Sequence, residues 1–132
     1  MRIRCLGLIL LFLLGCSRQP VLVPVQGTVF LDGRPLAEGK IFFVFAGKVP
    51  ESLDVKDGRF KGKVLSGDRR VEIAAYRLKD FSLDVPTSMQ PLLEPGRENY
   101  LPERYHREST LTAKVKVSGG NEITFELVSK TE

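Results

Sequence analysis

The feature that most constrains the fold is a regular alternation of apolar and polar residues near the C-terminal end of the chain. Every second residue is apolar from Leu111 to Val117, and the same pattern returns from Ile123 to Leu127. A period of two places neighbouring side chains on opposite faces of a β-strand, so each run predicts a strand with one buried face. We expect the two strands to pair, with lysines of the first facing glutamates of the second.

Turn signals divide the preceding residues into further short strands. Asp57–Gly58 separates Leu53–Lys56 from Arg59–Val64, and this dipeptide predicts a hairpin with a type I′ turn. Asp32–Gly33 predicts an earlier turn in which glycine adopts a positive φ. Lys40–Ala46 is apolar on both faces, which favours a central strand whose phenylalanines belong to the core. The expected strands cover residues 25–31, 40–46, 53–56, 59–64, 70–78, 111–117 and 123–127.

These patterns predict an all-β fold of about seven strands. The chain of 132 residues is too short for two independent cores, and its composition, 42% hydrophobic and 27% charged, is ordinary for a globular protein. No segment has a convincing helical periodicity. We therefore expect a single antiparallel β-sandwich with Greek-key connections.

The N-terminal segment differs in composition from the rest of the chain. Two arginines in Met1–Arg4 precede Leu6–Leu14, which is almost wholly apolar. This apolar stretch is shorter than the roughly 20 residues that a bilayer-spanning helix needs. A short apolar core behind a positive start is the layout of a secretory signal peptide, so we expect residues 1–15 to be removed on export.

The end of this segment, Leu13-Leu14-Gly15-Cys16, resembles the lipobox of bacterial lipoproteins. The resemblance implies cleavage beside the small Gly15 and attachment of a diacylglyceryl group to the Cys16 thiol. Residues 16–23 then form a lipidated tether, and two or more acyl chains give durable attachment to a membrane. The residue after the cysteine is serine rather than aspartate, which by the same resemblance favours the outer membrane over the inner one.

Removal of the signal peptide changes both the charge and the cysteine content. Arg2 and Arg4 leave with it, so 20 basic residues become 18 against 16 acidic ones, and the net charge falls from +4 to +2. The basic residues are dispersed along the chain, and we expect no nucleic-acid partner. Because Cys5 is also removed and Cys16 is acylated, no disulfide forms and the exported domain depends on core packing alone.

Several short motifs after the tether match turn and packing positions of known domains. They are Val25–Val29 with Leu31–Leu36, Asp57–Phe60, Leu101–Tyr105 and Ser109–Thr112. Together they resemble the carboxypeptidase-regulatory-like, or transthyretin-like (prealbumin-like), domain found in small bacterial lipoproteins without assigned activity. The resemblance extends over most of Pro24–Val128 and implies a transthyretin-like sandwich for residues 24–132. Turn and packing motifs imply a fold and say little about chemistry.

One long segment, Lys79–Arg107, lacks strand periodicity, and loops of this length are usually functional or disordered. Its second half concentrates aromatic and charged residues. From these we take Tyr100, Arg104, Tyr105 and Arg107 as candidate ligand contacts, because aromatic faces and guanidinium groups suit sugars, peptides or anionic polymers. Packing of the Tyr105 ring under the loop is the favoured alternative.

The sequence offers little for a reactive centre. His106 is the only histidine, and a triad with Ser109 would lack a nucleophile elbow. Asp32 and Asp57 lie in turn motifs and lack the further ligands of a calcium loop. We therefore expect no catalytic residue, no metal site and no cofactor.

The expected function follows from these points. We expect a non-enzymatic lipoprotein that acts as a structural or interaction module of the bacterial cell envelope. The alternative is an envelope binding protein for a glycan, a peptide or another cell-surface component. The expected partners are the membrane, through the acyl chains on Cys16, and envelope proteins or polysaccharide.

Overall fold

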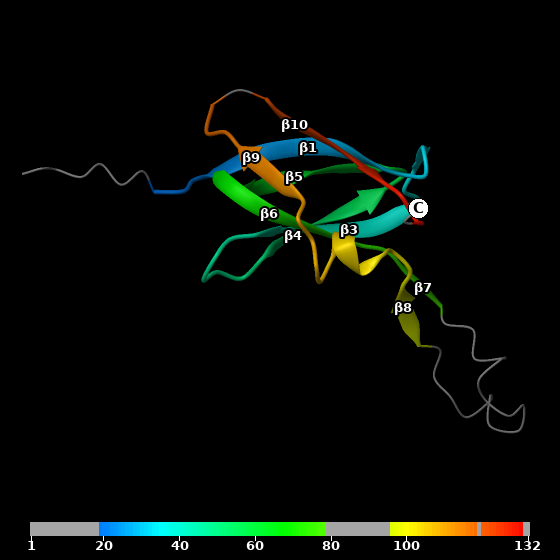
Figure 1. The fold of residues 1–132 in the computed structure, drawn as a ribbon. Helices are drawn as coiled ribbons and strands as arrows, with labels where there is room; N and C mark the ends of the chain where they lie inside the picture. Colours follow the sequence, from blue (N-terminus) through cyan, green and yellow to red (C-terminus); the bar gives the residue numbers. More distant parts are fainter. Residues whose placement is uncertain (1–18, 79–95, 119, 131–132) are drawn as a thin grey trace, which may run out of the picture.

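The computed structural model describes residues 19–78, 96–118 and 120–130, and these form an all-β structure (Figure 1). The seven expected strands correspond to β1 (Leu22–Leu31), β3 (Glu38–Val44), β4 (Glu51–Lys56), β5 (Arg59–Leu65), β6 (Gly67–Ala74), β9 (Thr112–Val115) and β10 (Asn121–Leu127). The expectation of one strand over residues 70–78 is wrong, because the chain leaves the main sheet after β6 and residues 76–78 form a separate strand. Three short strands and one 3₁₀ turn accompany them: β2 (Arg34–Pro35), β7 (Tyr76–Leu78), β8 (Arg97–Asn99) and η2 (Glu103–Tyr105).

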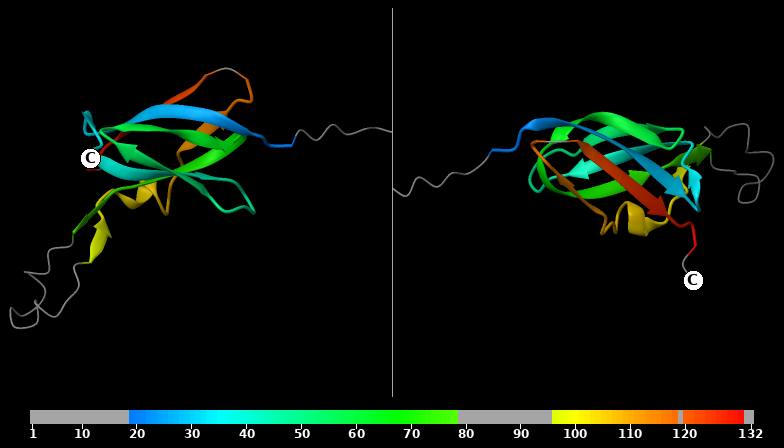
Figure 2. Two further views of the ribbon diagram at one scale, coloured as in Figure 1. Left: turned by 180° about the vertical axis from the view of Figure 1, so that it is seen from behind. Right: turned by 90° about the horizontal axis from the view of Figure 1, so that it is seen from above.

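The main sheet has the strand order β10-β1-β5-β4-β3-β6-β9, with β2 paired to β1. It is strongly curled, so that β10, β1 and β5 face β4, β3, β6 and β9 across the core (Figures 1 and 2). The curl turns at β4 and β5, which pair only at Lys56 and Arg59 beside their turn and then diverge. The other neighbours on this path are antiparallel, except that β1 and β10 are parallel.

The expectation that the last two long strands pair with each other is wrong. β9 pairs with β6, where Ala113 lies opposite Arg69, whereas β10 pairs with β1, where Ile123 lies opposite Gly27. The Asn121 amide helps to explain the separation, because its side chain binds both the N–H and the carbonyl of Lys116, at 2.8 and 2.9 Å. The N–H and carbonyl of Lys116 are therefore bonded to the Asn121 side chain and not to the backbone of a hairpin partner. The two strands lie in opposite layers, and each buries its apolar face against the other layer.

Both predicted Asp-Gly turns are present. Asp57 and Gly58 have φ values of 51° and 74°, and Asp32 and Gly33 have values of 51° and 78°, as type I′ turns require. The turns differ in their surroundings. A Cβ at Gly58 would lie 2.6 Å from the Cβ of Pro35, whereas nothing lies within 4 Å of a Cβ at Gly33.

The core lies between the two layers and is built from the side chains that each strand points inward. Its fully enclosed members are mostly branched aliphatic residues of β1, β3, β4, β5 and β6: Val25, Val29, Ile41, Val55, Val64, Val71 and Ile73. In the phenylalanine-rich strand, Phe43 is buried with its ring centroid 6.3 Å from that of Phe60, but Phe42 and Phe45 are half-buried. Core placement of this strand is therefore confirmed for Ile41 and Phe43, and its other face is only partly covered.

Candidate functional site

A groove is formed where the chain leaves the main sheet after β6. Ala75 is buried, its N–H donates to the Asn99 side-chain oxygen at 3.1 Å, and its carbonyl accepts the Tyr100 N–H at 3.0 Å. These bonds end the pairing with β3 and direct β7 into a separate pair with β8. Gly39 on β3 permits the close approach, since a Cβ there would lie 2.7 Å from the Ala74 carbonyl oxygen.

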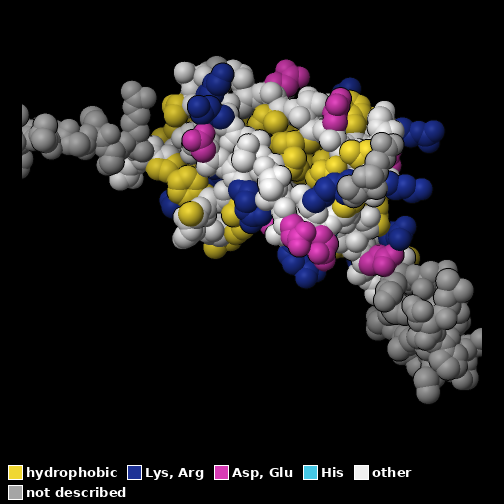
Figure 3. Space-filling model, viewed as in Figure 1, with side chains coloured by type: hydrophobic (Ala, Val, Ile, Leu, Met, Phe, Trp, Pro, Cys, Tyr) yellow, Lys and Arg dark blue, Asp and Glu magenta, His cyan; other side chains and the backbone are white. Residues whose placement is uncertain are grey.

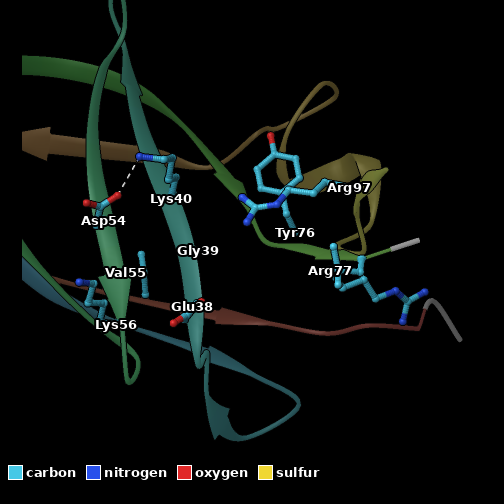
Figure 4. Close-up of a pocket in the computed structure, with 10 residues that line it drawn as sticks. Glu38, Gly39, Lys40, Asp54, Val55, Lys56, Tyr76, Arg77 and Arg97 are labelled. Atoms are coloured by element: carbon cyan, nitrogen blue, oxygen red, sulfur yellow. Dashed lines mark hydrogen bonds and ion pairs between the residues drawn. The ribbon is translucent and has the colours of Figure 1, made fainter. Parts of the chain in front are cut away.

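The groove lies between the outer face of β3–β4 and the β7–β8 pair, and it has a volume of about 420 Å³ (Figure 4). This is within the size range of small-molecule sites. We call it the β3–β4 groove; its lining residues are Glu38, Gly39, Lys40, Asp54, Val55, Lys56, Tyr76, Arg77, Leu78 and Arg97. A neighbouring hollow shares Glu38, Lys56 and Tyr76 with it and continues the groove to Tyr100.

The floor of the groove carries charges of both signs. Glu38 lies opposite Lys56, and Lys40 lies opposite Asp54, in the register of β3 and β4. The Lys40 ammonium group is 2.8 Å from the Asp54 carboxylate. Its hydrogen bond and charge lower the pKa of Asp54, so this carboxylate is charged at neutral pH. The floor therefore offers both donors and acceptors to a polar chain lying across it.

The wall of the groove combines an aromatic ring, an aliphatic side chain and a guanidinium group. In the register of β7 and β8, Leu78 lies opposite Arg97, and Tyr76 is on the same face two residues along. Tyr76 and Leu78 are both exposed, and Figure 4 places Tyr76 next to Arg97 across from β3. This set suits the faces of sugar rings or the side chains of an extended peptide, with Arg97 able to bind a carboxylate.

Arg77 occupies the other face of the β7–β8 pair. Its side chain points away from β3 (Figure 4), is 2.8 Å from a carboxylate oxygen of Glu98, and lies 5.7 Å from the centre of the Tyr100 ring. These contacts brace the wall from behind. Arg97 is thus the basic side chain of the β7–β8 pair that faces the groove.

The four candidate contacts taken from the sequence are not gathered in one place. Tyr100 is half-buried and lies along the groove. The Tyr105 hydroxyl accepts the Val128 N–H at 2.8 Å from within the core, and Arg104 covers the Tyr105 ring and donates to the Val128 carbonyl. Tyr105 therefore packs, as the favoured alternative predicted, and with Arg104 it fastens the end of β10. Arg107 lies on the exposed turn after η2, 3.7 Å from Glu103.

Sequence reasoning missed most of the groove, although a signal for its wall was present. Val71, Ile73 and Ala75 mark the inward phase of β6, so Tyr76 falls on the outward phase, where a large aromatic residue is informative. The charged floor carried no such signal, because Lys40 and Asp54 resemble ordinary solvent-facing strand residues. Lys40 and Asp54 lie near Arg97 only because the fold brings distant parts of the chain together.

Polar side chains next to η2 bind backbone groups of the sheet and of the loop itself. The Ser109 hydroxyl donates to the Val71 carbonyl and accepts the Leu111 N–H at 3.2 Å. The His106 ring nitrogen Nε2 is 3.2 Å from the Leu101 carbonyl oxygen. In the described part of the chain, no three His, Cys, Asp or Glu residues are grouped so that they could hold a metal ion.

Some predictions fall on residues outside those that the structure describes. These are the lipobox, Leu13, Leu14, Gly15 and Cys16, and residues 79–95 of the long loop. Among the residues that are described, no helix has the length and apolar character needed to cross a membrane.

The described residues thus define an all-β domain with a grooved outer sheet face. Comparison of the chain with protein-family models, with curated proteins and with solved structures finds no match in any of the three. The resemblance to transthyretin-like domains therefore stays a prediction.

Proposed function

We propose that this protein is a lipoprotein of the bacterial cell envelope, anchored through acyl chains on Cys16, whose β-domain binds an envelope polymer in the β3–β4 groove. The polymer is a glycan or an extended peptide. The proposal includes a transthyretin-like Greek-key sandwich for residues 24–132, a non-enzymatic role, and the outer membrane as the site of attachment.

The observation that carries the binding role is the combination of exposed Tyr76 and Leu78 with Arg97 beside a charged floor. Apolar and aromatic side chains that line a concave surface together with a few polar groups are typical of binding sites. The location also favours binding. The β7–β8 pair, which forms the wall of the groove, lies at the end of the domain away from the start of β1 (Figure 1), so an anchored domain would present the groove outwards.

A non-enzymatic role is favoured by the contacts of the loop residues. The Ser109 hydroxyl donates to the Val71 carbonyl of β6, and the His106 ring binds the Leu101 carbonyl within the loop. A nucleophile and its base must instead bind each other. The groove offers surfaces for recognition, and its charged groups are paired or solvent-exposed.

Binding is tested with the full-length lipoprotein purified in detergent and mixed with isolated peptidoglycan sacculi or with envelope polysaccharide. Sedimentation measures the bound fraction. Tyr76→Ala and Arg97→Ala should each weaken binding at least about fivefold, as removal of a central contact does. Lys61→Ala is the control, since Lys61 is an exposed basic residue of β5 on the opposite layer. Equal binding by all four proteins would refute the role of the groove.

The anchor is tested separately by acyl labelling and envelope fractionation of the wild type and of Cys16→Ser. The wild type should take up the label and sediment with membranes, and Cys16→Ser should do neither. A wild-type protein that is released unlabelled would contradict the anchoring, whatever the binding result.

A further inference from the structure

Exposed aliphatic side chains gather at the end of the domain where the N-terminal segment reaches β1. Val21 and Leu22 lie at the start of β1, Val49 lies in the β3–β4 loop and is 87% exposed, and Val117 follows β9 and is 66% exposed. Among the described residues, seven large apolar side chains are exposed, and these four share one end. Figures 1 and 2 show the three segments at this end in every view, and Figure 3 shows apolar side chains around the start of the chain. We call this end the tether pole.

Specific contacts hold the three segments together, so the tether pole is a built surface. The Asn121 amide donates to the Pro24 carbonyl at 3.3 Å as well as binding Lys116, which joins the β9–β10 loop to β1. Leu22 pairs with Leu65, whose N–H donates to the Glu51 carboxylate at 2.9 Å. Because Glu51 begins β4, this bond joins β1 and β5 to the end of the β3–β4 loop.

Lysines surround the apolar side chains of the tether pole. Lys48 lies beside Val49, Lys116 lies beside Val117, and Lys63 pairs with Pro24 at the start of β1. All three are exposed. The acidic residues of this end are Asp68, which lies opposite Lys114; Glu51, which is paired with Arg69; and the exposed Glu122. The charge around the tips is therefore positive.

Aliphatic side chains on loop tips with lysines around them have the chemistry of a membrane-contacting surface. We propose that the tether pole docks the domain on an anionic phospholipid surface, with Val49 and Val117 entering the headgroup region and the lysines binding lipid phosphates. The docking rests on the proposed anchor at Cys16. It fixes the orientation of the domain, which the acyl chains alone leave free.

The length of the tether supports a lipid surface as the partner. Five residues separate Cys16 from Leu22. An extended chain spans at most about 3.5 Å per residue, so the pole stays within roughly 20 Å of the acylated cysteine. At this distance a weak lipid contact is effectively intramolecular and needs little affinity of its own. When the tether pole is docked, the β3–β4 groove at the other end of the domain faces away from the membrane.

The test uses the acylated full-length protein in vesicles, after mass spectrometry has established acylation of Cys16. An environment-sensitive fluorophore is attached to Val49→Cys, to Val117→Cys or to the control Leu78→Cys. Leu78 is a matched control because it is 66% exposed, like Val117, but lies on the β3–β4 groove. Vesicles contain phosphatidylcholine with or without phosphatidylglycerol, and lipids with a nitroxide quencher report contact.

In vesicles with phosphatidylglycerol, labels at positions 49 and 117 should be quenched and the label at 78 should not. Lys48→Glu with Lys116→Glu should lower the docked-to-undocked ratio at least tenfold, because each lysine near an anionic surface contributes roughly a fivefold factor. Lys56→Glu, which reverses a charge away from the tether pole, should leave the docked-to-undocked ratio unchanged. Equal quenching at 49, 117 and 78, or none at all, would overturn the docking. Contact between labels on two protein copies without lipid quenching would overturn it in favour of self-association.

A failure of docking is distinguishable from a failure of the anchor. If Cys16 carries no acyl group, the proposed function fails at the mass measurement. If the protein is acylated but the labels are not quenched, the anchor stands and the docking is wrong.

Discussion

Replacement of Glu51 by alanine should destabilise the domain by about 3 kcal/mol, because it leaves the Arg69 guanidinium group buried without a counter-charge. The Arg69 side chain is 0% exposed and lies on the inward phase of β6. It donates to the Glu51 carboxylate and to the Phe43 carbonyl at 3.2 Å, and lies 4.8 Å from the centre of the Phe45 ring. Its Nε and Nη1 atoms have no hydrogen-bond partner among the described residues. In the described part of the chain, Glu51 thus supplies the one opposite charge bonded to it.

The magnitude follows from the burial of the two partners. Removal of one member of a buried ion pair costs about 3–5 kcal/mol. The Glu51 side chain is 23% exposed, so water reaches this end of the pair and the lower part of the range applies. Loss of the acceptor for the Leu65 N–H adds to the effect. Arg69→Met removes the buried charge itself, so its stability should stay within about 1 kcal/mol of the wild type.

Urea unfolding followed by circular dichroism measures these free energies, since the chain has no tryptophan for fluorescence. With a typical urea dependence for a domain of this size, a loss of about 3 kcal/mol lowers the midpoint by roughly 2 M. The double variant Glu51→Ala/Arg69→Met should regain about 2 kcal/mol relative to Glu51→Ala, because the unpaired charge is gone. A Glu51→Ala protein within 1 kcal/mol of the wild type would refute the reasoning, as would a double variant no more stable than Glu51→Ala.

Three further predictions concern the turns and the C-terminal end. Gly58→Ala should destabilise more than Gly33→Ala in urea unfolding, because both need a positive φ but only the first also clashes with a neighbour; equal losses would contradict this. Tyr105→Phe should cost about 1 kcal/mol by the same measurement, since a backbone N–H loses its acceptor; an unchanged midpoint would exclude that bond. The pKa of Asp32 is lowered by hydrogen bonds from the Ser129 hydroxyl and N–H, so its contribution to stability is present above the ordinary aspartate pKa and is lost as pH falls through the lowered value. An NMR titration should give a lowered pKa for Asp32 that rises in Ser129→Ala, and an identical value in both proteins would refute this origin.

Much of the secondary structure could be predicted from local patterns. The Asp57–Gly58 and Asp32–Gly33 turns form as expected, because a type I′ turn depends on the φ preferences of two adjacent residues. The alternation over Ile123–Leu127 also identifies β10 and its buried face, with Phe125 and Leu127 in the core. A period of two is a property of the strand itself, whichever strand pairs with it.

Pairing and burial of charge could not be predicted in the same way. Both β9 and β10 have one apolar face, and that pattern is satisfied by pairing with each other or with β6 and β1. The alternation of β6 places the Arg69 side chain on the same inward face as those of Val71 and Ile73. Its ion pair with Glu51, however, joins residues that are 18 apart in the sequence and lie on two strands that are not neighbours in the sheet. Such contacts depend on how the sheet curls.

The same division holds for function. The sequence by itself determined the alternating strands, the Asp-Gly turns and the motif at Cys16 that predicts a lipid anchor, because each is read within a few consecutive residues. Only the tertiary structure decided that Tyr76 and Arg97 face the floor formed by Lys40 and Asp54, and that Tyr105 fastens the end of β10. The physical reason is that a groove is a relation between distant segments, and the free energy that brings them together comes from burial of a shared core.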